Sequence, residues 1–218
     1  MYNAAEVHPM ILFWTVFAIL LAYLLGAVPG GLVLGRLAGV NLRTVGSGNA
    51  GATNAVRAGG MPFGLAVFAF DAAKGIVAVL LLPRLAGTGA EWLAAACAAA
   101  VVVGHVFPLW FRFRGGKGFA TALGAILALS PLALAPVAGM WILLLLLTGY
   151  VSVATLVAAL TYPVFTVVMW GTERPALLIF SIALALFLFY THRDNVMRLR
   201  RGDEHRFHRV WLLGRVLH

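Results

Sequence analysis

Between Gly118 and Thr172 the chain runs for 55 residues without a charged side chain. A helix crosses the hydrocarbon of a bilayer with about 20 apolar residues, so this stretch has room for two long membrane-spanning helices or three shorter ones. The whole chain is 62% hydrophobic and only 11% charged, whereas about a quarter of the residues of a soluble domain are charged. The sequence therefore predicts an integral membrane protein and excludes a soluble enzyme, a disordered chain and a nucleic-acid-binding domain.

Breaks in the apolar pattern divide the chain into seven expected spans. Pro131 and the turn at 148–152 cut the long uncharged stretch into three pieces, of which the first is short for a full crossing. We therefore expect an all-α polytopic helix bundle and, since no internal repeat or linker is visible, a single membrane domain over 1–218. The expected spans are about 10–30, 61–82, 92–110, 119–130, 132–147, 152–170 and 175–191, followed by a basic tail at 192–218.

The distribution of Lys and Arg favours seven spans over six. With seven, 13 of the 16 basic residues lie on one side of the membrane, in the loops at 31–60 and 108–118 and in the tail. With six, the seven tail arginines would face away from these two basic loops. Because Lys and Arg are enriched in cytoplasmic loops, we expect the N-terminus outside and the C-terminus in the cytoplasm.

The first loop on the inner side contains GSGNAGATNAVRAGG at 46–60, a pattern that suits a phosphate group. Its glycines let backbone N–H groups converge on one concavity, and hydroxyl, amide and guanidinium side chains surround them. The alternative is a flexible glycine-rich connector, which does not usually carry so many hydrogen-bonding side chains. The expected ligands are the backbone of Gly46, Gly48 and Gly51 and the side chains of Ser47, Asn49, Thr53, Asn54 and Arg57.

The second inner loop reads GHVFPLWFRFRGGKG at 104–118 and places Lys117 on a turn with Gly115, Gly116 and Gly118, directly before a helix. A helix N-terminus together with a lysine suits a phosphate dianion. The alternative is that the basic residues of this loop only anchor the inner face of the protein. His105, at the start of the segment, is either a hydrogen-bonded structural residue or an acid or base.

Two further polar segments are expected at the same leaflet. TGYVS at 148–152 carries Ser152, although taken alone it is a helix boundary. In THRDNVMRLRRGDE at 191–204, His192 and Asn195 share one side of a helix. The other interpretation of this segment, compatible with the first, is a basic amphipathic tail on anionic lipid. Its lipid contacts would then be Arg200, Arg201, Arg206 and Arg209.

Charged and metal-ligating residues within the spans are few. Asp71 and Lys74 are three residues apart in the second span, so we expect them to form a mutually neutralising structural pair. The one cysteine, Cys97, lies in an apolar run, and no acidic cluster is present that could hold Mg²⁺. We therefore expect neither a metal nor a cofactor, and a transfer from an already activated donor fits best.

The motifs GSGNAGATNAVR, GHVFPLWFRFRGGKG, TGYVS and HRDNVMRLRRGDE, in this order over 10–204, resemble those of the PlsY family of bacterial acyl-phosphate:glycerol-3-phosphate acyltransferases. The resemblance implies transfer of a fatty acyl group from acyl phosphate to the 1-position of glycerol 3-phosphate, giving lysophosphatidic acid and inorganic phosphate in phospholipid biosynthesis. It also implies seven spans in the bacterial inner membrane, with the active site facing the cytoplasm. The expected partners are the two substrates and the lipid bilayer, with no nucleic acid and no obligate protein partner.

The residues and the resemblance together assign roles within these motifs. One position departs from the family, whose members usually carry Arg or Lys where this chain has Gly149, and we expect Gly149→Ala to leave most activity. The expected catalytic residues are Ser47, Asn49, Arg57, Lys117, Ser152 and His192. The expected substrate- or phosphate-binding residues are Gly46, Gly48, Gly51, Thr53, Asn54, His105, Gly115, Gly116, Gly118 and Asn195.

Two other functional classes compete with the enzyme. A transporter or channel for a phosphorylated anion predicts polar groups on both faces of the membrane, whereas the outer loops of this chain are short and bland. A non-catalytic lipid-binding scaffold would not need the clustered Ser, Asn and Thr residues. For the enzyme, we expect the departing phosphate to take the proton of the attacking hydroxyl, and His192 is the rival base.

Overall fold

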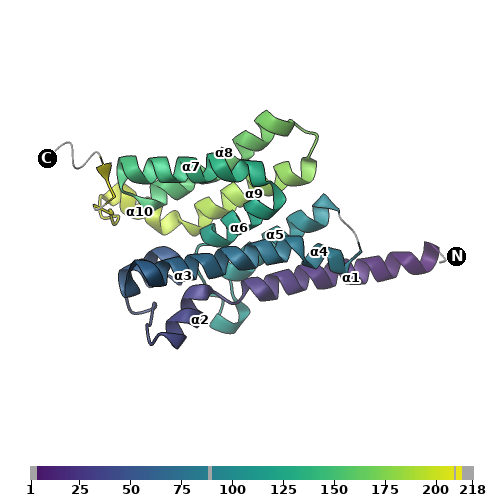
Figure 1. Cartoon of the computed structure of the whole chain (residues 1–218), viewed down its shortest axis with the longest axis horizontal. Coiled ribbons are helices and arrows are strands. Elements are labelled where there is room, and N and C mark those ends of the chain that lie inside the picture. Colours follow the sequence, from purple (N-terminus) through teal and green to yellow (C-terminus); the bar gives the residue numbers. More distant parts are fainter. Residues whose placement is uncertain (1–3, 88–89, 209, 213–218) are drawn as a thin grey trace. The chain divides into compact units, whose positions relative to one another are not determined.

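The computed structural model describes residues 4–87, 90–208 and 210–212, and these residues form helices and connections with no β-strand (Figure 1). The chain divides into two compact units, Met1–Leu129 and Ser130–His218. The N-terminal unit contains α1 (Ala4–Gly26), α2 (Gly30–Leu37), α3 (Ala52–Leu80), α4 (Leu82–Leu85), α5 (Glu91–Val106), the short 3-10 helix η1 (Leu109–Phe111) and α6 (Phe119–Leu129). The C-terminal unit contains α7 (Pro131–Thr148), α8 (Val151–Trp170), α9 (Pro175–Thr191) and α10 (Arg193–Arg201).

In the N-terminal unit, α3 packs along α6 and α1 packs along α5 (Figure 1). Where α3 meets α6, Gly75 faces the backbone of α6 and Gly124 faces the backbone of α3. A Cβ atom at either position would overlap the facing main chain. Small residues of this kind let helices approach closely in a membrane, where van der Waals packing drives association.

In the C-terminal unit, α8 packs against both α7 and α9. Polar side chains join α8 to the start and the middle of α7. The Ser130 and Tyr162 hydroxyls are 3.0 Å apart, and the Trp141 indole N–H donates to the Thr155 hydroxyl at 3.1 Å. These hydrogen bonds provide partners for polar groups that could not form hydrogen bonds with lipid tails.

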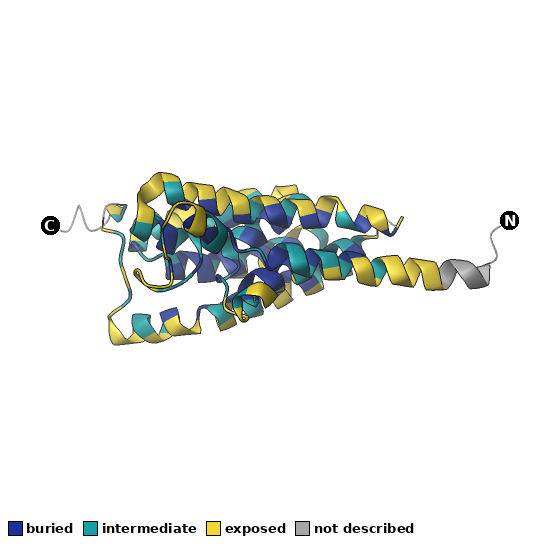
Figure 2. Ribbon diagram, turned by 90° about the horizontal axis from the view of Figure 1, so that it is seen from below, coloured by how far each residue is buried: buried dark blue, intermediate teal, exposed yellow. Residues whose placement is uncertain are grey.

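Among the described residues, five helices are long and apolar enough to cross a membrane, and a sixth is added if α9 and α10, bent by 54°, count as one span. Large apolar side chains such as Leu12, Val168 and Leu186 are more than 60% exposed, and Figure 2 shows one such exposed stretch along α1. Surfaces of this kind suit contact with lipid. The all-helical membrane architecture is confirmed for the described residues, whereas seven spans and the orientation of the termini stay predictions.

Some helix boundaries differ from the expected spans. The first apolar stretch, predicted at 10–30, is interrupted after Gly26, and α2 begins behind Pro29, which has no N–H to continue a helix. The predicted loop at 46–60 ends at Gly51, because ATNAVRA already forms the first turns of α3. A kink at Gly60, with φ of 82°, separates these turns from the apolar part of the helix. Thr53, Asn54 and Arg57 therefore lie on a helix rather than in a loop.

Candidate active site

Asn54 organises the loop that joins α2 to α3. Its side-chain nitrogen lies 3.0 Å from each of the carbonyl oxygens of Leu42, Val45 and Asn49. Its side-chain oxygen accepts the backbone N–H of Ser47 at 3.0 Å. Asn54 is only 2% exposed, so the structure gives it a role in shaping the loop, which the sequence did not predict. Its predicted contact with substrate stays a prediction.

The N-terminus of α3 opens onto this loop. Gly51 is the N-cap residue and provides no side-chain cap, and Asn49 accepts the Gly51 N–H through its side-chain oxygen at 3.0 Å. Ser47 is exposed, and Thr53 and Arg57 are half-buried beside the first turns of α3. A helix N-terminus flanked by a hydroxyl and a guanidinium suits an anion, as predicted for this segment.

The glycine-lysine turn is held against the end of α5. The Gly115 N–H donates to the Val106 carbonyl at 3.0 Å, and the Gly116 N–H donates to the His105 carbonyl at 3.1 Å. A Cβ atom at Gly116 would overlap the His105 ring. Lys117 is half-buried two residues before α6 begins at Phe119, so the turn that carries it leads directly into a helix, and its contact with phosphate stays a prediction.

Arg43 links the glycine-rich loop to the glycine-lysine turn of the N-terminal unit. Its guanidinium donates to the Arg114 carbonyl and, at 3.4 Å, to the Gly48 carbonyl. The glycine-rich loop and the glycine-lysine turn are therefore brought together within this unit. Sequence reasoning counted Arg43 only as an inner-face charge, because nothing in the sequence indicates a bond to a carbonyl 71 residues away.

A buried ionic cluster lies behind the glycine-lysine turn. The Lys74 ammonium is 2.9 Å from the Asp71 carboxylate and 2.8 Å from Nδ1 of His105, and His105 Nδ1 is 3.3 Å from Asp71. All three residues are buried. The predicted Asp71–Lys74 pair is confirmed, and His105 is a third member, which supports its structural interpretation.

The same cluster supplies hydrogen-bond partners for backbone groups at the break between α1 and α2. Lys74 donates to the carbonyls of Gly26 at 3.0 Å and Val28 at 3.1 Å, and Asp71 accepts the Gly30 N–H at 3.0 Å. Charges within a membrane helix are costly unless they are paired and hydrogen-bonded. The cluster therefore joins the four helices α1, α2, α3 and α5 and, through His105, supports the turn that carries Lys117.

In the C-terminal unit, Glu204 connects two predicted site residues. Its carboxylate accepts hydrogen bonds from Ser152 Oγ at 3.0 Å, from Asn195 at 2.6 Å and from Arg198 at 2.7 Å. Burial alone would raise the pKa of Glu204, but these three hydrogen bonds outweigh it and hold the pKa below its usual value. The carboxylate is therefore ionised at neutral pH. Sequence reasoning missed Glu204, which the sequence shows only as one acid in a basic tail.

His192 is oriented by the backbone of α9. Its Nδ1 atom lies 2.9 Å from the Leu188 carbonyl, and because a carbonyl oxygen only accepts, Nδ1 carries the proton. In the neutral imidazole Nε2 is then the basic nitrogen.

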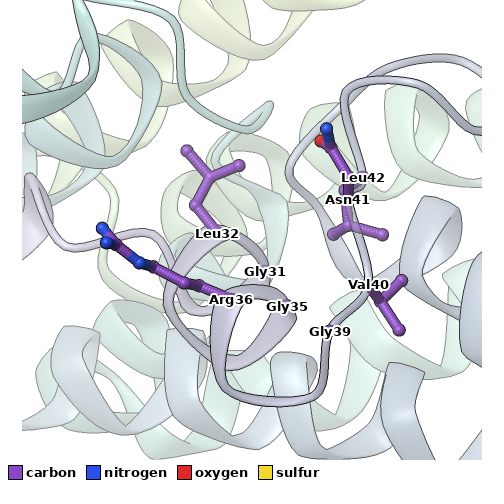
Figure 3. Close-up of a pocket in the computed structure, with 8 residues that line it drawn as sticks. All are labelled: Gly31, Leu32, Gly35, Arg36, Gly39, Val40, Asn41 and Leu42. Carbon is purple, nitrogen blue, oxygen red and sulfur yellow. The ribbon is translucent and has the colours of Figure 1, made fainter.

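A hollow of about 240 Å³ lies between α2 and the segment that follows it (Figure 3). Arg36 points away from Val40 and Asn41 on the opposite wall. None of the predicted site residues lines this hollow, so the site assignment does not depend on it.

Comparison with known proteins identifies the family of the chain. The family model described as glycerol-3-phosphate acyltransferase matches residues 16–202. The chain belongs to the glycerol-3-phosphate acyltransferase family. A relative from Geobacter sulfurreducens, named glycerol-3-phosphate acyltransferase, is 40% identical over 186 residues, which are 85% of this chain and 94% of the relative. The PlsY resemblance of the motifs is thereby confirmed.

Two crystal structures of PlsY, an integral membrane glycerol 3-phosphate acyltransferase, share the fold of this family member with a TM-score of 0.82 each. The glycerol 3-phosphate form is 39% identical and covers 88% of this chain and 95% of its own. The lysphosphatidic acid form is 37% identical and covers 91% of this chain and 98% of its own. This acyltransferase is therefore an integral membrane protein.

The hydrogen bonds around Glu204 lead to a prediction for this acyltransferase. Glu204→Gln removes the charge that pairs with Arg198 and one acceptor position, so we expect it to lower the free energy of unfolding by about 1–3 kcal/mol. Asp203→Asn, an exposed change of the same charge, is the matched control. Thermal unfolding in detergent measures both variants.

The pH dependence of that difference tests its cause. Because the pKa of Glu204 is lower in the folded protein than in the unfolded chain, its stabilising effect is complete above the unfolded pKa and is lost as pH falls through the folded pKa. The difference in the free energy of unfolding between wild type and Glu204→Gln should therefore become smaller as the pH falls below about 4.5. A difference that stays constant between neutral and acidic pH would contradict this role of the carboxylate.

Proposed function

We propose that this protein transfers a fatty acyl group from acyl phosphate to the 1-position hydroxyl of glycerol 3-phosphate, giving lysophosphatidic acid and inorganic phosphate. The observation that carries the proposal is the pairing, through Arg43, of an uncapped helix N-terminus with a glycine-lysine turn in a membrane protein of the glycerol-3-phosphate acyltransferase family. Both are features that bind phosphate groups. The glycerol 3-phosphate and lysphosphatidic acid forms of PlsY support the choice of acceptor and product.

In the proposed step the acceptor hydroxyl attacks the acyl carbonyl, a new ester C–O bond forms, and the bond between the acyl group and phosphate breaks. Two phosphate groups about 5–6 Å apart repel by several kcal/mol even at an effective dielectric constant of about 20. Lys117, Arg57 and the N–H groups of the glycine loop offset this repulsion and hold the hydroxyl for attack. Ser47, Asn49 and Thr53 supply further hydrogen bonds in the N-terminal unit.

The proton of the attacking hydroxyl goes to the departing phosphate in this proposal. Phosphate is a good leaving group from a mixed anhydride, so no acyl-enzyme intermediate is needed. Once it departs, the phosphate is basic enough to accept the proton of the hydroxyl. In the C-terminal unit, Ser152 and Asn195 are held by Glu204 as binding residues. His192, whose tautomer leaves Nε2 as the basic nitrogen, is the competing proton acceptor.

The donor is tested by comparing palmitoyl phosphate with palmitoyl-CoA. We expect purified protein to convert glycerol 3-phosphate with palmitoyl phosphate, in the presence of EDTA, and to be inactive with the thioester. The physical reason is that acyl phosphate already carries an activated leaving group, so no metal ion is required. Robust turnover with palmitoyl-CoA, or loss of activity on chelation, would reject this donor and mechanism.

We further propose seven spans in the bacterial inner membrane, with the N-terminus outside and the active site facing the cytoplasm. The clustering of basic residues in the two inner loops and the tail supports this orientation. The shortest proposed span is α6, whose 11 residues cover about 16 Å, roughly half of the hydrocarbon thickness.

Cysteine labelling in intact cells tests this topology. In a Cys97→Ala background, we expect Thr172→Cys to react with an impermeant maleimide from outside. Asp203→Cys should react only after permeabilisation. Both positions are exposed, so a failure to react reports sidedness rather than burial. External labelling at position 203 would rule out the seven-span arrangement.

A further inference from the structure

The tail that follows α10 folds back onto the turn between α7 and α8. The Phe207 N–H donates to the Gly149 carbonyl at 2.8 Å, and the Trp211 indole N–H donates to the Leu147 carbonyl at 3.0 Å. The match to the family ends at residue 202, so these contacts come from residues beyond it.

In the same region the Arg206 guanidinium lies over two aromatic rings. It lies 4.4 Å from the ring centre of Tyr150 and 3.9 Å from that of Trp211. Gly149 has φ of 71°, and a Cβ atom there would lie 2.8 Å from Arg206 Cγ and 3.0 Å from Trp211 Cβ. Only glycine therefore accommodates both the turn and the tail that packs on it.

The stacked guanidinium is available to an anion. A cation–π contact leaves the hydrogen-bond donors of a guanidinium unused, and these donors can bind phosphate with two parallel bonds. Its Nε atom is buried and has no acceptor among the described residues. The nearby carboxylate of Glu204 is already bonded to Ser152, Asn195 and Arg198.

Arg206 stands next to predicted site residues of the C-terminal unit. Tyr150, on which it stacks, precedes Ser152 by two residues, and Ser152 Oγ is bonded to Glu204, two residues before Arg206. Tyr150 is also the N-cap residue of α8 and provides no side-chain cap, so the first N–H groups of α8 lie at the same turn.

We propose that Arg206 binds a phosphate group of a substrate beside Ser152, so that the folded-back tail takes part in substrate binding by the C-terminal unit. This inference rests on the proposed function. It assigns Arg206 to a phosphorylated substrate instead of the lipid contact expected from the sequence. A lipid headgroup shares the phosphate chemistry, and the experiment separates the two sources.

The test compares Arg206→Met, Arg206→Lys and the control Arg201→Met in an uncharged detergent. Met keeps apolar bulk beside the rings and removes the charge, and Arg201 is an exposed arginine at the end of α10. With palmitoyl phosphate and glycerol 3-phosphate, we expect Arg206→Met to raise the KM for a phosphorylated substrate and the inhibition constant for inorganic phosphate roughly tenfold or more. Arg206→Lys should be intermediate, and Arg201→Met should stay within about twofold of wild type.

A second measurement does not depend on turnover. We expect inorganic phosphate to raise the thermal unfolding temperature of wild type and Arg201→Met but not of Arg206→Met. If wild type lacks acyltransferase activity, the proposed function fails, while this measurement still decides whether Arg206 binds phosphate.

Three results would overturn the inference. The first is that Arg206→Met and Arg201→Met have the same kinetic constants. The second is that Arg206→Met lowers the unfolding temperature without changing any KM or the phosphate inhibition constant, which would make Arg206 a structural clamp only. The third is that the effect occurs in vesicles with phosphatidylglycerol but not in vesicles of phosphatidylcholine alone, which would make the lipid headgroup the ligand.

Discussion

Lys117→Ala is expected to reduce turnover about 30- to 1,000-fold while the protein still folds and inserts. Lys117 stands on the turn that leads into α6, and its ammonium group is proposed to contact phosphate in the transition state. Loss of a charge-assisted contact of that kind costs roughly 2–4 kcal/mol. Steady-state kinetics with palmitoyl phosphate and glycerol 3-phosphate measure the effect.

Two variants serve as controls for this prediction. Lys117→Arg should restore only part of the activity, because a planar guanidinium does not fit a glycine-walled turn shaped for a compact ammonium. Arg114→Ala should cost little, because its side chain is exposed and its carbonyl, which accepts from Arg43, remains. Similar small losses for Lys117→Ala and Arg114→Ala would show that this turn is not the phosphate site.

Lys74→Met is expected to be among the most destabilising single changes in the chain. It leaves the buried Asp71 carboxylate without its cation and leaves the Gly26 and Val28 carbonyls without their donor. Removing one partner of a buried ion pair costs about 3–5 kcal/mol. Thermal unfolding in detergent should show a large fall in the unfolding temperature.

The double variant Asp71→Asn, Lys74→Met tests the origin of that cost. Because it removes both charges, we expect it to be more stable than Lys74→Met alone, which is the coupling that a double-mutant cycle detects. If Asp71→Asn changes the free energy of unfolding by the same amount in wild type and in Lys74→Met, the coupling is zero and the two residues do not interact as an ion pair.

Most of the helical framework could be predicted because its signal is local. Apolar runs bounded by Pro131, Thr148 and Pro175 gave helices close to the observed α7, α8 and α9. Helix boundaries were harder to predict where a high glycine content favours a loop and neighbouring residues favour a helix. The 46–60 segment is rich in glycine, yet its second half forms the start of α3, since its Ala residues favour a helix once Asn54 holds the preceding loop.

The contacts that shape the candidate site were harder to predict, because they join residues distant in sequence. His105 meets Asp71 and Lys74 across more than 30 residues, and Glu204 meets Ser152 across 52. The contacts of Gly149 with the tail also join residues that are distant in sequence. The sequence predicts that replacement of Gly149 by alanine leaves most activity, whereas in the structure the tail packs against this glycine, which has a positive φ.

The fate of the bridging oxygen of acyl phosphate tests the central claim most directly. Palmitoyl phosphate labelled with ¹⁸O between the acyl carbon and phosphorus is incubated with the purified protein and unlabelled glycerol 3-phosphate. Attack at the acyl carbon predicts that the label appears in inorganic phosphate, with one phosphate released for each 1-palmitoyl-glycerol 3-phosphate formed. Label in palmitate or in the lipid product, or release of phosphate without that product, would contradict acyl transfer by this protein.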